Sequence, residues 1–146
     1  MVCPLIRLRK ILVATDGSIY SEAALLDAMR LASACATKLY ILSVIETNIE
    51  FESMALNQMD ALEGECGKIL NAAKEQAVKN GIDCEIISRR SDDTAIAIVD
   101  EAKSLGADMI VLGKHGAKRG LKKLLMGSVT EKMIGEAPCS VLVVKA

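Results

Sequence analysis

Residues 10–32 read KILVATDGSIYSEAALLDAMRLA, and this stretch contains the pattern that decides the fold. The apolar run Ile11–Ala14 does not alternate with polar residues, which is typical of a strand buried on both faces of a parallel sheet. After a short loop, apolar residues recur at helical spacing through Ser21–Ala36, and Ser18 or Ser21 is placed to cap that helix. The stretch therefore predicts a buried strand followed directly by an amphipathic helix.

The same alternation of strand and helix continues to the end of the chain. Further short apolar runs occur at Leu39–Val44, Cys84–Ile87, Met109–Leu112 and Ser140–Val144. Helical patterns separate them and cover Met54–Lys79, Asp93–Leu105 and Ser128–Glu136. Alternation of this kind predicts one α/β domain, residues 1–146, with an open parallel sheet, right-handed crossovers and helices on both faces.

Residues that favour caps and turns mark the boundaries of these helices. Asn80-Gly81 and Gly106 favour a left-handed conformation after the second and third helices. Asp92 or Asp93 is suited to cap the start of the third helix, because a carboxylate accepts hydrogen bonds from its first free N–H groups.

Composition and charge exclude several classes of function. The formal net charge is −1 and aromatic residues make up 2% of the chain, so neither a global basic field nor a base-stacking platform supports a nucleic-acid partner. No run approaches the roughly 18 apolar residues of a membrane span, and the first residues lack the apolar core of a signal peptide. We therefore expect a cytoplasmic protein that engages neither nucleic acid nor membrane.

The cysteines and the familiar catalytic motifs add further exclusions. The chain has five cysteines, an odd number, and no pair has CxxC spacing, which favours reduced thiols over a disulfide framework or a zinc site. The P-loop pattern, the GxSxG elbow and a GxGxxG fingerprint after the first strand are absent from the sequence. His115 is the one histidine, and we favour a structural role for it, so no catalytic residue is assigned.

The segment Gly113–Lys132, GKHGAKRGLKKLLMGSVTEK, is the strongest candidate for a binding site. It leaves a buried strand through a glycine and reaches a predicted helix start at Gly127-Ser128. Free N–H groups and the dipole at a helix start favour an anion, and glycines let the backbone approach it. The bases between the two ends are Lys114, Lys118, Arg119, Lys122 and Lys123. Both a phosphate site and a solvated basic loop fit these residues.

Asp16 follows the first predicted strand and has two possible roles. Ligands of doubly wound sheets bind beyond the carboxyl ends of strands, where the winding reverses, and this places Asp16 across from the basic segment. Its carboxylate is suited to accept hydrogen bonds from ribose hydroxyls or to help hold a metal. The alternative is that Asp16 only caps the first helix.

Taken together, these segments resemble the universal stress protein family over essentially the whole chain. KILVATDGSIYSEAALLDAMRLA resembles the family's first strand, aspartate-containing loop and first helix. The stretches GADMIVLGKHG and GSVTEKMIGEAPCSVLVVK resemble the C-terminal part of the family's sequence. The resemblance implies a Rossmann-like, five-stranded parallel sheet of order 3-2-1-4-5. It also implies the branch of the family that binds ATP through the motif G-x2-G-x9-G-S/T.

The resemblance also implies a set of nucleotide-binding residues. Glycines 113, 116 and 127 and Ser128 match the phosphate motif, Asp16 matches the aspartate near the ribose, and the backbone of Val44 matches the position that reads adenine. The full implied set is Ala14, Thr15, Asp16, Val44, Leu112, Gly113, Gly116, Gly127, Ser128 and Val129. Ten residues, 117–126, separate the second and third motif glycines where the family has nine. We interpret the difference as a one-residue bulge near 118–120 that leaves both ends in place.

The function that the resemblance implies is a nucleotide-dependent switch in the stress response. ATP, with Mg²⁺ or Mn²⁺, would alter a surface that an unknown protein partner reads. The last strand, 140–144, would lie at a sheet edge and pair with its copy in a homodimer. Two alternatives stay open: a slow ATPase or phosphoryl-transfer enzyme, and a dimeric interaction module that binds no nucleotide.

Overall fold

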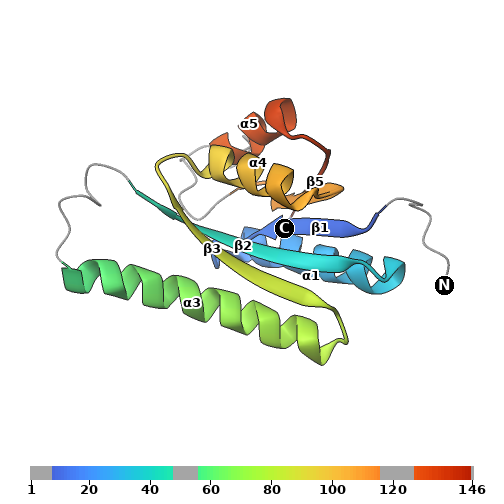
Figure 1. The fold of residues 1–146 in the computed structure, drawn as a ribbon, viewed down its shortest axis with the longest axis horizontal. Helices are drawn as coiled ribbons and strands as arrows, with labels where there is room; N and C mark the ends of the chain where they lie inside the picture. The colour runs from blue at the N-terminus through green and yellow to red at the C-terminus, as the bar shows by residue number, and fades with distance from the viewer. Residues whose placement is uncertain (1–7, 48–55, 116–126, 146) are drawn as a thin grey trace.

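The computed structural model of the protein describes residues 8–47, 56–115 and 127–145, and these ranges contain five strands and four helices (Figure 1). The strands are β1 (Lys10–Ala14), β2 (Lys38–Glu46), β3 (Cys84–Ser91), β4 (Met109–Gly113) and β5 (Ser140–Val144). The helices are α1 (Ile19–Cys35), α3 (Leu56–Lys79), α4 (Thr94–Leu105) and α5 (Ser128–Glu136). The predicted order of elements is confirmed.

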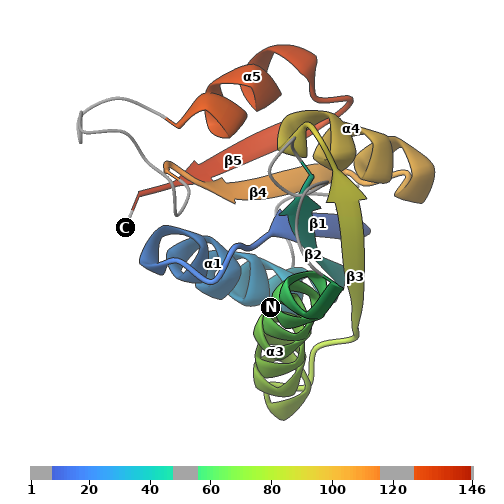
Figure 2. The same ribbon diagram turned by 90° about the vertical axis from the view of Figure 1, so that its left-hand side faces the viewer.

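The strands form one parallel sheet of order β3-β2-β1-β4-β5, as expected. Residue Ile11 of β1 pairs with Leu39 of β2 on one side and with Met109 of β4 on the other. Figure 2 shows α1 and α3 on one face of the sheet and α4 and α5 on the opposite face. The winding therefore reverses between β1 and β4, in the middle of the sheet.

Alternate residues of each central strand enter two separate cores. In β1, Ile11 and Val13 pack beneath α1 and α3, whereas Leu12 packs beneath α4 and α5. All three side chains are 0% exposed. Burial on both faces explains why the run is apolar throughout, because neither set of alternating positions is exposed to water.

Local capping decides which of the candidate residues begins each helix. Ser18 caps α1 by accepting from Ser21 N, and Asp93 caps α4 by accepting from Ile96 N. Gly81 and Gly106 adopt positive φ, as predicted. Ala36 also adopts a left-handed conformation after α1, with φ of 49°, although a Cβ makes this conformation unfavourable.

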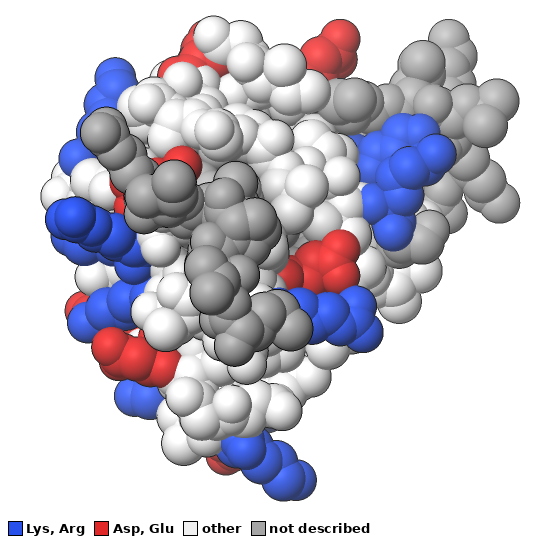
Figure 3. Space-filling model, turned by 90° about the vertical axis from the view of Figure 1, so that its right-hand side faces the viewer, with Lys and Arg blue, Asp and Glu red and all other residues white. Residues whose placement is uncertain are grey.

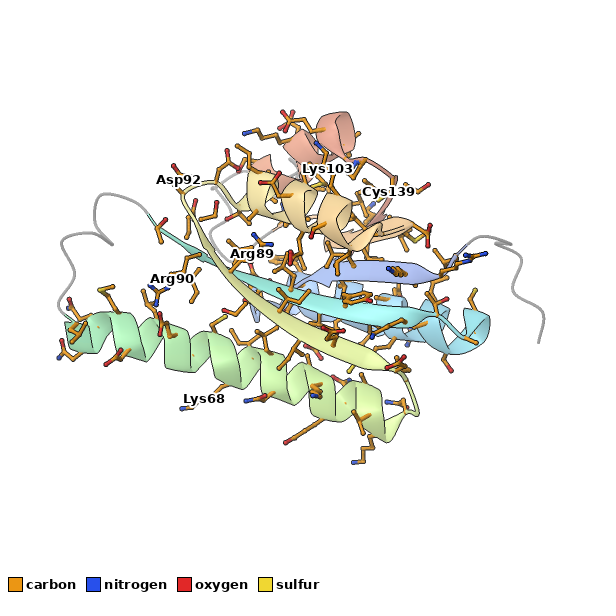
Figure 4. The ribbon with its side chains drawn as sticks, viewed as in Figure 1. Lys68, Arg89, Arg90, Asp92, Lys103 and Cys139 are labelled. Atoms are coloured by element: carbon orange, nitrogen blue, oxygen red, sulfur yellow. The ribbon has the colours of Figure 1, made fainter. Side chains whose placement is uncertain are left out.

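Strand β3 is four residues longer than the predicted run, which ended at Ile87, and it continues to Ser91. The added residues are polar, so hydrophobic patterning does not reveal them. They stay in the sheet because β2 pairs with them as far as its own last residue. Two ion pairs hold them from both faces, Arg89 with Glu101 of α4 and Arg90 with Glu63 of α3 (Figure 4).

The cysteines differ from the expectation at one position. Cys66, Cys84 and Cys139 are free thiols, and burial raises the pKa of Cys84 and Cys139. Cys35 is disulfide-bonded, so the expectation of reduced thiols is wrong for this residue. Sequence spacing did not reveal the bond, because the fold and not the spacing decides which thiols approach one another.

None of the helices in the described ranges has the length and apolar character needed to cross a membrane.

Candidate functional site

The loops after β1 and β4 lie side by side at the carboxyl edge of the sheet. The two strands are neighbours, with Val13 paired to Val111, so the residues that follow them emerge together. The start of α5 returns to the same edge, where Gly127 N donates to Lys114 O at 2.9 Å. The fold thus brings three segments that are distant in sequence to one place, the reversal point at which ligands bind in sheets of this kind.

A network of hydroxyl groups shapes the loop after β1. Thr15 N donates to Leu42 O at 2.8 Å, which anchors the loop to β2. The hydroxyls of Thr15 and Ser21 are 3.1 Å apart, and both residues are buried. Ser21 Oγ also accepts from Asp16 N at 3.3 Å. The backbone of Asp16 is therefore held from within the fold.

The carboxylate of Asp16 is presented at the rim of this edge. The residue is exposed, and its Oδ1 accepts from Ser18 N at 3.0 Å. Ser18, not Asp16, supplies the side-chain cap of α1. The N-cap residue is thus Ser18, and the bond that Asp16 accepts from Ser18 N lies in the turn before the helix.

Gly113 permits close contact between β4 and α1. A Cβ placed on Gly113 would lie 2.6 Å from Tyr20 O and 2.8 Å from Tyr20 C. Both are backbone atoms of the first turn of α1, so a side chain there requires the helix to move. The sequence suggested close approach to a ligand as the reason for this glycine, and the structure adds packing between helix and strand.

His115 makes a packing contact beneath the same edge. It is 8% exposed, and its ring meets that of Tyr20 edge-to-face, with centroids 5.3 Å apart. Aromatic pairs favour this geometry. The contact supports the structural role expected for His115 and joins the residues after β4 to α1.

The N-cap residue of α5 is a glycine, so it offers no side chain to the first N–H groups of the helix. Gly127 is its N-cap residue, and it makes no side-chain hydrogen bond, whereas side chains cap α1 and α4. The first bond of the helix runs from Glu131 N to Gly127 O at 3.0 Å. The N–H groups of Ser128, Val129 and Thr130 precede it and have no acceptor within the helix. Such N–H groups, with the positive end of the helix dipole, favour an anion.

The hydroxyl of Thr130 joins α5 to β4. Thr130 Oγ1 donates to Gly113 O at 2.8 Å, and the bond is buried. Nothing in the sequence marks Thr130 or Ser21 as part of this edge, apart from the candidacy of Ser21 as a helix cap. Their roles depend on contacts between separate elements.

The backbone of Val44 faces the space beyond the end of β1. Leu42 O accepts from Thr15 N, so the polar backbone groups of Leu42 point toward β1. Backbone directions alternate along a strand, and those of Val44 therefore point to the same side. The β1–β2 pairing ends at Leu42, so β1 does not bond to the backbone of Val44. The strand was predicted to end at Val44, but β2 continues to Glu46.

Two predicted contacts can reach a ligand through their backbones only. Leu112 is 4% exposed and Val129 is half-buried, and both side chains pack in the core beneath α4 and α5. The structure places Ala14, Thr15, Asp16, Gly113, Gly127 and Ser128 around the ends of β1 and β4. Gly116 and the bases at 118, 119, 122 and 123 lie outside the described residues.

Within the described ranges, no three His, Cys, Asp or Glu side chains gather in an arrangement that could hold a metal ion.

The sequence model of the universal stress protein family matches residues 7–145 of this chain. The chain belongs to this family. Universal stress protein YxiE of Bacillus subtilis (strain 168) is 34% identical over 147 residues, which cover 93% of this chain and 98% of that protein. This universal stress protein therefore matches a curated relative along nearly the whole length of both.

Two solved structures extend the comparison to the fold. The structure of MJ0577, which was used to assign a biochemical function to that protein, has a TM-score of 0.85 at 31% identity and covers 95% of this chain and 96% of that chain. A universal stress protein in complex with cAMP has a TM-score of 0.72 at 26% identity and covers 94% and 97% of the two chains. The sheet order observed here is thus that of a universal stress protein, as the resemblance implied.

Proposed function

We propose that this universal stress protein binds ATP at the carboxyl edge of β1 and β4 and acts as a nucleotide-dependent switch. The observation that carries the proposal is the start of α5, which has a glycine as its N-cap residue and which hydrogen bonds hold beside the end of β4. Free N–H groups in this position suit a phosphate group. The complex of a related universal stress protein with cAMP supports an adenine nucleotide as the ligand.

The residues present fit each part of the nucleotide. The backbone of Val44 points to the side of β1 beyond the β1–β2 pairing, where it would read the edge of adenine. The exposed carboxylate of Asp16 would accept hydrogen bonds from ribose hydroxyls. The N–H groups of Ser128 and Val129 would hold phosphate oxygens, joined by Gly116 if the family motif acts in full. Mg²⁺ or Mn²⁺ would arrive with the nucleotide on its phosphates.

The charges of the described residues do not favour a polyanionic partner. On the face in Figure 3, which lies at the amino-terminal end of the strands, the basic and acidic groups of the described residues are interspersed. The described residues of that face therefore form no continuous basic field of the kind that binds a nucleic-acid backbone. At the proposed site, Lys114 lies after β4, while Asp16 and Glu131 add negative charge nearby.

A homodimer through β5 is the second part of the proposal. The strand lies at one edge of the sheet, and Val141, Leu142 and Val143 are half-buried in the single chain. An apolar edge with unpaired backbone groups favours pairing with another strand, and a second copy offers the same edge. Nucleotide binding would then change a surface of the dimer that a protein partner reads. The cytoplasmic location stays a prediction.

The test is nucleotide-dependent stabilisation of the purified protein. The melting temperature is measured against increasing Mg·ATP, with Mg·GTP as the control, after the absence of co-purified nucleotide has been checked. A ligand at 100 times its Kd stabilises the native state by about 2.7 kcal/mol. We expect a saturating rise with ATP and none with GTP. Protein free of bound nucleotide that shows no rise with ATP contradicts the proposal and favours the nucleotide-free interaction module.

A further inference from the structure

Thr130 occupies an unusual position for a helical threonine. It lies in the first turn of α5, yet it is 4% exposed and its hydroxyl bonds outside its own helix. The acceptor is Gly113 O, 2.8 Å away and 17 residues earlier in the chain. The bond joins the last residue of β4 to the turn that carries the first N–H groups of the helix.

Further backbone bonds complete the connection. Gly127 N donates to Lys114 O at 2.9 Å, and Lys114 N donates to Val144 O at 3.0 Å. The residue before α5 is thus tied to the residue after β4, which is tied in turn to β5. These bonds set the position of the helix start relative to the sheet, whatever the number of residues between Lys114 and Gly127.

The other side of Gly113 contacts the half of the site that contains Asp16. The space where its Cβ would lie is taken by the backbone of Tyr20, and Ser21 N would be 3.2 Å from that Cβ. Ser21 in turn accepts from Asp16 N. Gly113 therefore lies between the two halves of the site, and Thr130 is the side chain that fixes α5 to it.

We infer that Thr130 is a positioning residue for phosphate binding: its hydroxyl holds the free N–H groups of Ser128 and Val129 in register with the ends of β4 and β1. The inference rests on the proposed function and extends it to a residue outside the family motif. Removing the hydroxyl takes away the side-chain bond that helps to hold the helix start, and it leaves Gly113 O without this donor, while the bond from Gly127 N to Lys114 O remains. The loss acts on the contacts to the phosphates, whereas Val44 and Asp16 keep their positions on β2 and after β1.

A purely structural role predicts a different result, and the chain offers a matched control for it. Thr37 is also buried, at 3% exposed, and its Oγ1 also donates to a backbone carbonyl, Leu8 O, at 3.1 Å. It precedes β2 and therefore lies at the opposite, amino-terminal end of the sheet. Each of the variants Thr37→Val and Thr130→Val removes a buried threonine hydroxyl that donates to a backbone carbonyl.

The experiment compares the affinities of the full chain for ATP and for adenosine by calorimetric titration. Adenosine keeps the base and ribose contacts and lacks every phosphate. We expect Thr130→Val to weaken the binding of ATP about tenfold, a change of about 1.4 kcal/mol in binding free energy. The binding of adenosine should weaken less than about twofold. Thr130→Ser, which keeps the hydroxyl, restores the ATP affinity. Thr37→Val leaves the ratio of the two affinities as in the wild type.

The outcomes separate this inference from the function on which it rests. Wild-type protein that binds neither ligand contradicts the proposed function itself. The inference is overturned, and the proposed function stands, if the wild type binds ATP but Thr130→Val leaves the ratio of the affinities for ATP and adenosine unchanged or equal to that of Thr37→Val. Melting temperatures of the free variants establish that each one is folded during the titration.

Discussion

The carboxylate of Asp93 bonds two helices at once, and its bond to Lys132 is the one that crosses between them. Lys132 Nζ on α5 donates to Asp93 Oδ2 at 2.7 Å, while Asp93 Oδ1 accepts from Ile96 N at 3.1 Å and caps α4. The bond from Lys132, followed by that from Ile96 N, holds the pKa of Asp93 below its usual value. Helix α5, which begins at the proposed phosphate site, is thereby attached to α4.

This bond predicts a pH-dependent contribution to stability. Because the native state lowers the pKa of Asp93, the contribution is present above the unfolded pKa of about 4 and is lost as the pH falls through the lower, native value. Asp93→Asn keeps a good cap and removes the charge. We expect it to lower the melting temperature at pH 7, with a deficit that shrinks as the pH falls through the native pKa of Asp93 and the carboxylate is protonated.

Thermal unfolding at several pH values provides the measurement for Asp93→Asn. The control is Asp92→Asn, one residue earlier and exposed, for which we expect no comparable pH-dependent difference. A deficit of Asp93→Asn that is equal at neutral and acidic pH contradicts the charge-based account.

Gly113→Ala is expected to destabilise the protein by about 1–3 kcal/mol, because the added Cβ overpacks the junction. The atom it meets, Tyr20 O at 2.6 Å, belongs to the backbone and cannot rotate away. Urea unfolding measures the change. The control is Gly64→Ala in α3, where the added Cβ meets no atom within 4 Å apart from its chain neighbours and the adjacent backbone of its own helix. The removal of this helical glycine is expected to stabilise the protein by about 0.5–1 kcal/mol. Equal effects of the two variants would show that Gly113 is not required for packing.

Asp16→Ala is expected to weaken the binding of ATP about tenfold. This corresponds to about 1.4 kcal/mol of binding free energy for the loss of a charged acceptor at the ribose. Asp16→Ala also removes the bond that Asp16 Oδ1 accepts from Ser18 N, so the melting temperature of the free variant is measured to establish that it is folded. Calorimetric titration with ATP measures the affinity, and Asp92→Ala serves as the control from an exposed carboxylate at the end of another strand. Unchanged affinity in Asp16→Ala would exclude its proposed contact with the ribose.

Val143→Pro is expected to dissociate the proposed homodimer and leave the fold intact. Val144 O bonds to Lys114 N, so Val144 faces β4 and the backbone of Val143 faces the outer edge. Proline there removes an N–H that only a partner strand could use. Sedimentation velocity should report a monomer for Val143→Pro and a dimer for Val143→Thr, which keeps the N–H. A Val143→Pro variant that stays dimeric places the interface elsewhere.

The sheet was predictable because buried parallel strands are apolar throughout and the helices between them carry their own periodicity. The run Ile11–Ala14 differs from β1 by one residue, and β5 was predicted with the bounds observed. The polar end of β3 was not predictable, since Ser88–Ser91 remain in the sheet through pairing with β2 and through ion pairs to two helices. Cys35 was misread for a related reason, because its disulfide depends on which thiol the fold brings near.

The candidate site, like the sheet, was predictable from the sequence only in part. By itself, the sequence determined the order of elements, the glycines at the ends of β4 and before α5, and the aspartate after β1, because each follows from local pattern or from the family motif. Only the tertiary structure decided that Gly113 is packed against Tyr20, that Thr130 bonds to Gly113 O, and that Ser21 supports Asp16. Buried hydroxyls and backbone groups must find partners wherever the chain brings them, and those partners come from elements that lie far apart in the sequence.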